Sequence, residues 1–336
     1  MKKILVTGGL GFIGSHTVVE LLNDGYEVVI IDNLSNSKIE VLNNIVEITS
    51  KKPDFYQLDL RVKSEIKNFF DNNKVDGIIH FAAFKAVGES VEKPLEYYEN
   101  NIGSLVYLLQ EMRNRNIDNF IFSSSCTVYG QADELPITEN APVKPAESPY
   151  GNTKQIGEEI IKEACYANNL NAIALRYFNP IGAHDSIKIG ELPLGVPQNL
   201  IPFVTQTAAG IREQLSIFGN DYPTADGTAI RDYIHVVDLA KAHIVSLQRL
   251  FDKKNKHPFE FFNIGTGTGS SVLEVVKSFE QVTSQKLNYK IVDRRSGDIT
   301  AAYADTTLAN KELNWKAQKT LDQALLSAWL WQQKNI

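Results

Sequence analysis

The chain has few cysteines and no excess of positive charge, and each shortage excludes a class of protein. Only two cysteines, Cys126 and Cys165, occur among 336 residues. Two are too few for a disulfide framework, so we expect a reducing compartment. Lysine and arginine number 34 against 40 aspartates and glutamates. Because non-specific nucleic-acid binding needs a basic face, we expect no nucleic-acid partner.

Long apolar runs and metal-binding clusters are also missing from the sequence. The charge-free stretch 192–211 carries three prolines and several amide side chains. We therefore interpret it as a loop or pocket lining and not as a membrane span. The six histidines are scattered and the two cysteines lie far apart, so we expect no metal site. The first apolar run ends at Thr7, unlike a signal peptide, and we expect a cytoplasmic protein without a membrane partner.

What the chain does contain is an alternation of short apolar runs with helical segments. Hydrophobic residues make up 43% and charged residues 22%, an ordinary globular composition whose length suggests about two domains. Strands are predicted at residues 4–6, 27–31, 55–58, 77–81, 119–122 and 172–175, and helices at 15–23, 95–115 and 150–168. This alternation predicts an α/β fold with a doubly wound parallel sheet in residues 1–180. We expect a smaller mixed α/β domain in residues 181–336, with some of its segments returning to the first domain.

A glycine-rich turn follows the first predicted strand and opens a helix. Its glycines, Gly8, Gly11 and Gly14, permit a tight turn, close approach of a pyrophosphate and close packing of the helix, respectively. Asp32 lies at the end of the second strand, where a carboxylate binds ribose hydroxyls and repels a 2′-phosphate. The pattern predicts a Rossmann domain that binds NAD in preference to NADP. The alternative is a structural glycine turn with a surface aspartate.

Tyr150 and Lys154 are four residues apart and share one face of a predicted helix. A cation beside a phenol lowers the pKa of the phenol, which then serves as a general base toward an alcohol. Residues 123–125 are three serines that follow a predicted strand, where a hydroxyl would share the proton path. Such a Tyr-Lys pair alone is usually structural, but together with the glycine turn it favours catalysis.

With these motifs the sequence resembles the extended short-chain dehydrogenases/reductases, and within them the UDP-glucose 4-epimerase family. The closest resemblance lies in residues 8–16, 32–34, 123–130, 176–184, 217–224 and 231–236. It implies oxidation of a UDP-sugar at C4 by bound NAD, followed by re-reduction on the opposite face. It also implies that Ser125, Tyr150 and Lys154 are catalytic, although Cys126 stands where many members have alanine.

The same resemblance assigns binding residues. The cofactor contacts it implies are Gly8, Gly11, Phe12, Ile13, Gly14, Asp32, Asn33, Asp59, Leu60, Phe81, Ala82, Ala83, Lys85, Asn100, Ser123, Tyr150, Lys154 and Tyr177. The UDP-sugar contacts it implies are Lys85, Ser125, Tyr150, Asn179, Asn199, Leu200, Phe218, Arg231, Tyr233, Arg295, Asp298 and Ala302. Without the resemblance, Asn100 reads equally as a helix-face asparagine, and the two arginines as solvated surface charges.

One position bears on substrate choice. Family members strict for glucose and galactose carry a bulky tyrosine near the 2-position of the sugar, where this chain has Ala302. A small residue leaves room for a 2-acetamido group. We therefore expect UDP-N-acetylgalactosamine and UDP-N-acetylglucosamine to be substrates as well.

Other functions fit parts of the same pattern. A nucleotide-sugar 4,6-dehydratase shares the fold, but elimination needs a carboxylate after the strand-end serine, where the chain has Cys126 and Thr127. A UDP-glucuronate decarboxylase is disfavoured for the same reason, and a non-catalytic NAD sensor would have no need of the Tyr-Lys pair. The helices at 95–115 and 150–168 resemble the pair that forms a homodimer interface in the family. Their leucines, such as Leu105, Leu108 and Leu109, would equally cover the protein's own sheet.

Overall fold

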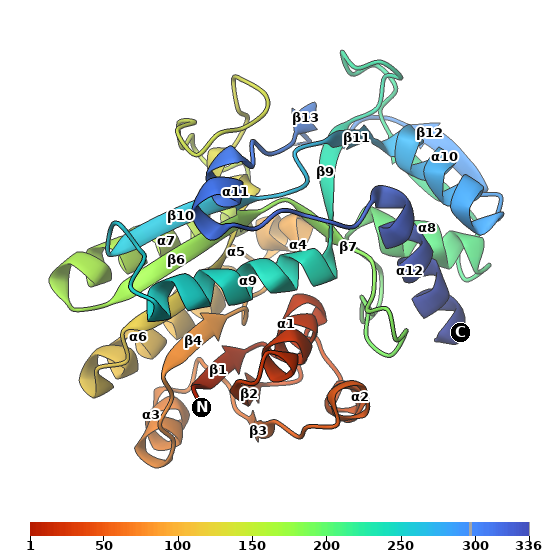
Figure 1. Ribbon diagram of the computed structural model, residues 1–336. Coiled ribbons are helices and arrows are strands. Elements are labelled where there is room, and N and C mark those ends of the chain that lie inside the picture. Colours follow the sequence, from red (N-terminus) through yellow and green to blue (C-terminus); the bar gives the residue numbers. More distant parts are fainter. Residues whose placement is uncertain (296–297, 336) are drawn as a thin grey trace.

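A computed structural model describes residues 1–295 and 298–335 (Figure 1). Its centre is a parallel sheet with the strand order β10-β6-β5-β4-β1-β2-β3. The strands are β1 (Lys3–Thr7), β2 (Glu27–Asp32), β3 (Asp54–Gln57), β4 (Gly77–His80), β5 (Asn119–Ser125), β6 (Asn171–Tyr177) and β10 (Phe259–Ile264). Helices cover both faces of this sheet, so the predicted α/β fold with a doubly wound parallel sheet is confirmed.

The strands form because their side chains are apolar on both faces of the sheet. Ile4 and Val6 pack on one face and Leu5 on the other, and all three are fully buried. One face is covered by α1 (Phe12–Asn23), α2 (Glu40–Thr49), α9 (Val236–Phe251) and α11 (Thr307–Leu313), and the other by α3 (Lys63–Asn72), α6 (Ser104–Arg115) and α7 (Pro149–Ala167). Continuous apolar strands of this kind are typical of parallel sheets buried between helices.

The second half of the chain forms smaller sheets and also contributes to the first. The mixed sheet contains β7 (Asn179–Ile181), β9 (Ile230–His235), β11 (Gly269–Ser271) and β13 (Ala301–Ala302), and a two-stranded sheet pairs β8 (Leu215–Phe218) with β12 (Tyr289–Val292). Helices α8 (Leu200–Ala208), α10 (Val272–Thr283) and α12 (Leu321–Lys334) share a separate core. However, β10, α9 and α11 pack with the large sheet. The division at residue 180 stays a prediction.

One local prediction is confirmed with a refinement, and one needs correction. The expected helix at 95–115 forms without a break, but its turns differ: α5 (Pro94–Tyr98) continues through a π-helical turn at Glu99–Gly103 into α6. The stretch 192–211 is not all loop, because residues 200–208 form α8. Pro202 is tolerated there because it lies in the first turn, where its missing N–H would have no partner in any case. No helix in the described ranges is long and apolar enough to cross a bilayer.

The strand order fixes where a ligand can bind. The chain runs outward from β1 to β2 and β3 in one direction, and through β4, β5 and β6 in the other. A crevice forms at the carboxyl ends of the strands where this order reverses. Here the reversal lies between β1 and β4, so the ends of these strands and of β5 border the candidate site.

Candidate active site

The turn after β1 has the geometry of a phosphate cradle. Gly8 has φ +67°, and a Cβ on it would lie 2.8 Å from the Ala82 nitrogen. A Cβ on Gly14 would lie 2.2 Å from the Gly8 carbonyl oxygen, so both positions require glycine. Gly11 begins α1 without a side-chain cap. The N–H groups of the first helical turn, which includes Phe12 and Ile13, therefore lack side-chain partners and suit an anion.

Asp32 is fixed against this turn by the protein's own hydrogen bonds. Its Oδ2 accepts from the Leu10 N–H at 3.0 Å, and its Oδ1 accepts from the Leu34 N–H at 2.9 Å and the Ser37 hydroxyl at 2.8 Å. A carboxylate has about four acceptor positions. For Asp32 to accept from two ribose hydroxyls as well, the Ser37 hydroxyl would have to turn away from the carboxylate. Ser37 was not predicted from the sequence.

A hollow beside Asp32 is the place expected for an adenine ring. Its lining residues are Asn33, Ser35, Gln57, Leu58, Asp59, Arg61 and Glu65. The Asn33 amide donates to Asp59 at 3.3 Å, and Arg61 donates to the same carboxylate at 2.7 Å. The Arg61 hydrogen bond lowers the pKa of Asp59 to about 2. Leu60, the other expected contact here, is buried.

The three expected catalytic side chains meet at the end of β5. Ser125 ends this strand and its hydroxyl accepts from the Thr127 N–H at 3.2 Å. Tyr150 and Lys154 project from the first turns of α7, and the nearby Ser125 lowers the pKa of the Tyr150 phenol. Lys154 donates to the Ser123 carbonyl at 2.6 Å. The spacing of Tyr150 and Lys154 therefore does bring a phenol, a hydroxyl and an ammonium together.

Burial controls the acidity of these groups. It raises the pKa of the Tyr150 phenol, an effect to which the nearby Tyr177 adds and which the Ser125 contact opposes. The net direction is thus opposite to the lowering expected from Lys154. Burial also lowers the pKa of Lys154 to about 8, against the raising effect of Glu158. Lys154 therefore still carries its charge over most of the neutral range.

Several other expected cofactor contacts surround this group. The Ser123 and Tyr177 hydroxyls are hydrogen-bonded to each other, and burial raises the pKa of Tyr177 to about 12. Phe81 follows β4, and its ring centre lies 4.7 Å from that of His243 on α9. Ala82 and Ala83 continue the same segment, and the Ala82 backbone lies beside Gly8 of the glycine turn.

Asn100 lies in the π-helical turn and is buried. It donates to the Asn101 side chain at 2.9 Å. Asn101 in turn bonds the backbone of Phe84 and the Thr153 hydroxyl, and so ties the loop after β4 to α7. Sequence reasoning did not find Asn101, although π-helical turns are frequent at functional sites.

Lys85 and Asn199 come from different halves of the chain and meet at one carboxylate. The Lys85 ammonium lies 3.1 Å from Oε1 of Glu191, and the Asn199 amide donates to the same oxygen at 2.8 Å. Asn199 also begins α8, whose first residue is Leu200. Glu191 was not predicted, because only the folded chain shows that it joins two expected substrate residues.

Arg231 and Asp298 form an ion pair. Arg231 lies on β9 opposite Ala302 of β13. Ala302 is 3% exposed and clusters with Val128 and Tyr129, which belong to the turn directly after Ser125. These expected substrate residues therefore lie beside the turn that follows Ser125.

The remaining expected substrate residues form two further pairs. The Arg295 guanidinium lies over the Phe218 ring, 4.8 Å from its centre. Asn179 on β7 is in register with Tyr233 on β9. Burial raises the pKa of Tyr233 to about 12, while the nearby Arg231 lowers it. All twelve expected substrate residues lie among the described residues.

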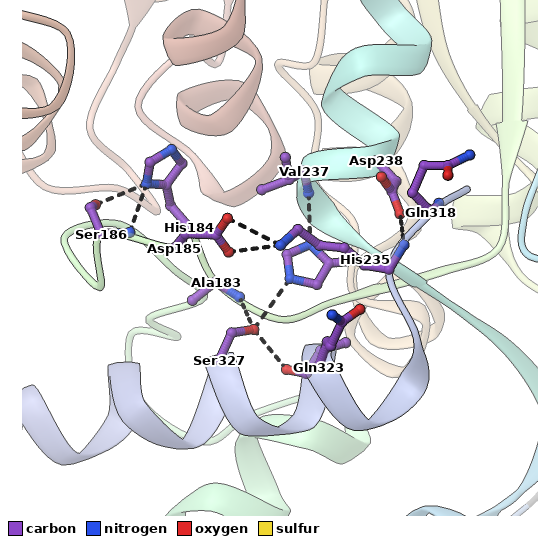
Figure 2. Close-up of polar contacts among 12 residues, drawn as sticks. Ala183, His184, Asp185, Ser186, His235, Val237, Asp238, Gln318, Gln323 and Ser327 are labelled. Atoms are coloured by element: carbon purple, nitrogen blue, oxygen red, sulfur yellow. Dashed lines mark hydrogen bonds and ion pairs between the residues drawn. The ribbon is translucent and has the colours of Figure 1, made fainter. Parts of the chain in front are cut away.

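His235 joins the end of β9 to the start of α9, and its contacts are structural (Figure 2). Its Nδ1 accepts from the Val237 N–H at 3.1 Å and so caps α9. Its Nε2 lies 3.3 Å from the Ser327 hydroxyl, which also accepts from the Ala183 N–H. The figure shows His184 pointing away from His235 toward Ser186. Within residues 1–295 and 298–335, no three His, Cys, Asp or Glu side chains gather in a way that would hold a metal ion.

Comparisons with known proteins agree over the full length of the chain. A family model described as GDP-mannose 4,6 dehydratase matches residues 5–327. A UDP-glucose 4-epimerase of Bacillus subtilis is 50% identical over 334 residues, covering 99% of this chain and 97% of the relative. A crystal structure of UDP-glucose 4-epimerase from Bifidobacterium longum in complex with NAD+ and UDP has a TM-score of 0.95 at 47% identity, covering 99% of this chain and 98% of that one. Another from Stenotrophomonas maltophila, with bound NAD and formylated UDP-arabinopyranose, has a TM-score of 0.96 at 43% identity, covering 100% and 99%.

Proposed function

Because this chain belongs to the UDP-glucose 4-epimerases, a family of extended short-chain dehydrogenases/reductases, we propose that it interconverts UDP-galactose and UDP-glucose with NAD as its cofactor. The observation that carries the proposal is the meeting of Ser125, Tyr150 and Lys154 at the end of β5, beside the glycine turn. We place this activity in galactose metabolism in the cytoplasm.

The chain has the groups that such a cofactor needs. The uncapped N-terminus of α1 suits the pyrophosphate, and Asp32 suits the adenosine ribose. NAD, when bound, supplies a hydride acceptor and donor for C4 of the sugar. Tyr150 accepts the O4 proton as C4 is oxidised and returns a proton when the 4-keto sugar is reduced on its opposite face. Net redox is zero, so the cofactor is not consumed.

The proton transfer requires that other groups offset the effect of burial on the pKa of Tyr150. Burial keeps its phenol protonated, whereas a general base must be available near the working pH. Ser125 stabilises the phenolate by hydrogen bonding, and the Lys154 ammonium, 5.8 Å from the Tyr150 ring centre, does so by its charge. We infer that both residues are needed to bring the phenol into its working range.

The substrate half offers complementary groups for a nucleoside diphosphate sugar. Arg231 and Arg295 supply cations for the diphosphate, since guanidinium groups match phosphate geometry. Phe218 offers a ring for the uracil, and Asp298 an acceptor for the uridine ribose. The other expected contacts on this side are Lys85, Asn179, Asn199, Leu200 and Tyr233.

We infer that the enzyme also accepts the 2-acetamido sugars. Ala302 packs on the turn that follows Ser125, and this packing supports a position of its small side chain near the reacting sugar. The test is turnover of UDP-N-acetylgalactosamine by protein that turns over UDP-galactose. If the protein turned over UDP-galactose but not UDP-N-acetylgalactosamine, the inference that Ala302 leaves room for a 2-acetamido group would be refuted.

The dehydratase alternative lacks an acid-base group. Burial raises the pKa of the Cys126 thiol to about 12, so the thiol stays neutral and cannot replace the carboxylate that elimination requires. The neighbouring Thr127 has no acid-base function near neutral pH. The family model that matches this chain is described as a GDP-mannose 4,6 dehydratase. The residues after Ser125 nevertheless favour epimerisation over elimination.

We propose that the protein is a homodimer. Leu105, Leu108 and Leu109 cover the chain's own sheet, so other residues must form the contact. Val91 on α4 (Val87–Glu92) is 63% exposed and Leu95 on α5 is 78% exposed, and both helices lie against α7. Leu95→Glu is expected to give monomers by light scattering, whereas Leu330→Glu on α12 leaves the dimer intact. Equal effects of both changes would contradict this interface.

The first experiment uses purified protein without added cofactor. Proton NMR with UDP-galactose is expected to show UDP-glucose, because the cofactor stays bound through each turnover. Tyr150→Phe is the matched inactive control. Absence of any product, even after addition of NAD, would refute the epimerase function and favour a dehydratase with another substrate or an NAD sensor.

A further inference from the structure

Glu158 is a buried carboxylate that the reaction described above does not use. It lies on α7, one helical turn after Lys154 and two turns after Tyr150. Its Oε1 accepts from the Ser124 hydroxyl at 2.5 Å. Its two oxygens also accept from Arg176, from Nε at 2.9 and 3.2 Å and from Nη2 at 2.5 Å. Glu158 therefore joins the helix that carries Tyr150 and Lys154 to two strands of the sheet.

The bond to Ser124 fixes the strand end that carries the other site residues. Side chains alternate along a strand, so Ser124 faces α7 while Ser123 and Ser125 face the opposite side. The Ser123 carbonyl accepts from the Lys154 ammonium at 2.6 Å, and Ser125 lies near enough to Tyr150 to lower the pKa of its phenol. A shift of Ser124 would move both neighbours relative to α7.

The bond to Arg176 fixes the chain on the other side of Ser125. Arg176 is in register with Ser124 on the adjacent strand β6. Its Nη1 donates to the Tyr129 hydroxyl at 2.9 Å, and its guanidinium lies 4.9 Å from the centre of that ring. Tyr129 ends the short helix that starts directly after Ser125. The strand end is thus held both before and after the catalytic serine.

Glu158 also contributes to the electrostatics around Lys154. On α7 the ammonium has Tyr150 and Glu158 nearby, and β5 presents the Phe122 ring, 5.0 Å away, and the Ser123 carbonyl. From β4 it faces His80, whose pKa is lowered to about 3 by burial and by Lys154, so this imidazole is neutral. Glu158 is the group whose charge raises the pKa of Lys154 against burial.

We propose that Glu158 is a positioning residue of the epimerase reaction: it holds the strand end that carries Ser123 and Ser125 and supplies a negative charge one turn from Lys154. This inference rests on the proposed function. A purely structural pair would affect the stability of the fold and leave the ionisation of Lys154 unchanged.

The test is Glu158→Gln, which keeps the size of the side chain and its acceptor oxygen for Ser124 but removes the charge. Without that charge the pKa of Lys154 falls, so the lysine loses its proton at lower pH. The alkaline limb of the kcat profile with UDP-galactose is expected to move to lower pH by about one unit or more. KM is expected to stay within about twofold of the wild-type value, because Glu158 does not touch the substrate residues.

The chain offers a control of similar burial in Arg249 and Glu260, where Arg249 also pairs with Glu312 at 3.1 Å. Both side chains are as buried as the Arg176–Glu158 pair, and Arg249 Nε donates to Glu260 at 2.7 Å, on α9 and β10. Glu260→Gln is expected to lower the thermal midpoint without moving the pH profile. An equal pH shift in both variants, or a loss in Glu158→Gln that lies entirely in KM, would overturn the proposal.

Two further measurements cover other outcomes. If Glu158→Gln does not fold, Ser124→Ala leaves the ion pair intact and is expected to lower kcat severalfold without shifting the profile; an unchanged kcat would overturn the positioning role. The 13C shift of the Lys154 side chain reports its titration whether or not the protein turns over UDP-galactose. A Lys154 titration unaffected by Glu158→Gln overturns the electrostatic role, whereas an inactive wild-type protein would count only against the epimerase function.

Discussion

The Lys154 ammonium donates to the Ser123 carbonyl at 2.6 Å and lies 5.8 Å from the centre of the Tyr150 ring. The lysine is therefore anchored to the strand, and its influence on the phenol acts through space. An anchored charge keeps a constant distance from Tyr150 while the phenol gains and loses a proton. Such preorganisation is what makes electrostatic stabilisation effective in a buried site.

Removing the phenol oxygen should stop the reaction without unfolding the protein. Tyr150→Phe is expected to lower kcat by roughly a thousandfold, because the general base is lost. The aromatic ring remains to fill its buried place, so the thermal midpoint should stay close to that of the wild type. Steady-state rates with UDP-galactose and calorimetry of the same sample check both statements. A kcat within about tenfold of wild type would contradict the role of Tyr150.

Two neighbouring arginines should differ in their effect on nucleotide binding. Arg295 lies over Phe218, whereas Arg294 pairs with the exposed Asp221 and lies over Tyr222. Arg295→Ala should weaken binding of UDP by at least about tenfold, since charge-assisted phosphate contacts are strong. Arg294→Ala should change the affinity by less than about threefold. Titration calorimetry with UDP decides, and equal losses in both variants would speak against the assignment.

A bulky residue at position 302 should narrow the substrate range. Ala302→Tyr is expected to abolish turnover of UDP-N-acetylgalactosamine and to retain turnover of UDP-galactose, because only the former needs space for an acetamido group. Ala302 is 3% exposed among Val128 and Tyr129, so overpacking will cost some stability. Ala302→Val, measured alongside, separates the steric effect from that cost. Parallel loss of both substrates in Ala302→Tyr would contradict the prediction.

Buried histidines should make the fold sensitive to acid. Burial lowers the pKa of His16 and His80 to about 3 and that of His235 and His243 to about 4, against 6.5 in an unfolded chain. Below pH 6.5 the unfolded chain binds more protons, so stability is full above that pH and falls as the pH approaches 4. Each histidine contributes a slope of about 1.4 kcal/mol per pH unit.

Urea unfolding at pH 7.5 and 5.5 measures this slope. In His243→Leu the free energy of unfolding should fall less between these two pH values than in the parent protein. The reason is that the variant lacks one imidazole that binds a proton in the unfolded chain but stays neutral in the folded one. Identical declines in the two proteins would refute the contribution of His243.

The parts of the site that could be predicted are those written in short, local patterns. The glycine turn, Asp32 and the spacing of Tyr150 and Lys154 each follow from one or two neighbouring elements, and the structure brings them to one edge of the sheet. The strand pattern also predicted the parallel sheet, because its apolar runs are buried on both faces.

What escaped prediction depends on contacts between distant segments. Glu191 joins Lys85 to Asn199, and Asn101 joins the loop after β4 to α7. Nothing in the sequence around a lone glutamate or asparagine indicates such partners. The net effect of burial on Tyr150 was likewise missed, because a charge four residues away is visible in the sequence and the depth of a side chain is not.

The pairing of β10 with β6 has a consequence for synthesis on the ribosome. Every backbone pair of β10, from Phe259 to Ile264, joins the outer edge of β6. While the chain is being made, residues up to 177 can assemble six strands, but the sixth presents an open edge until about ninety more residues emerge. Nascent chains of intermediate length therefore present the hydrogen-bonding edge of β6, and in the complete sheet β10 takes over the outer position.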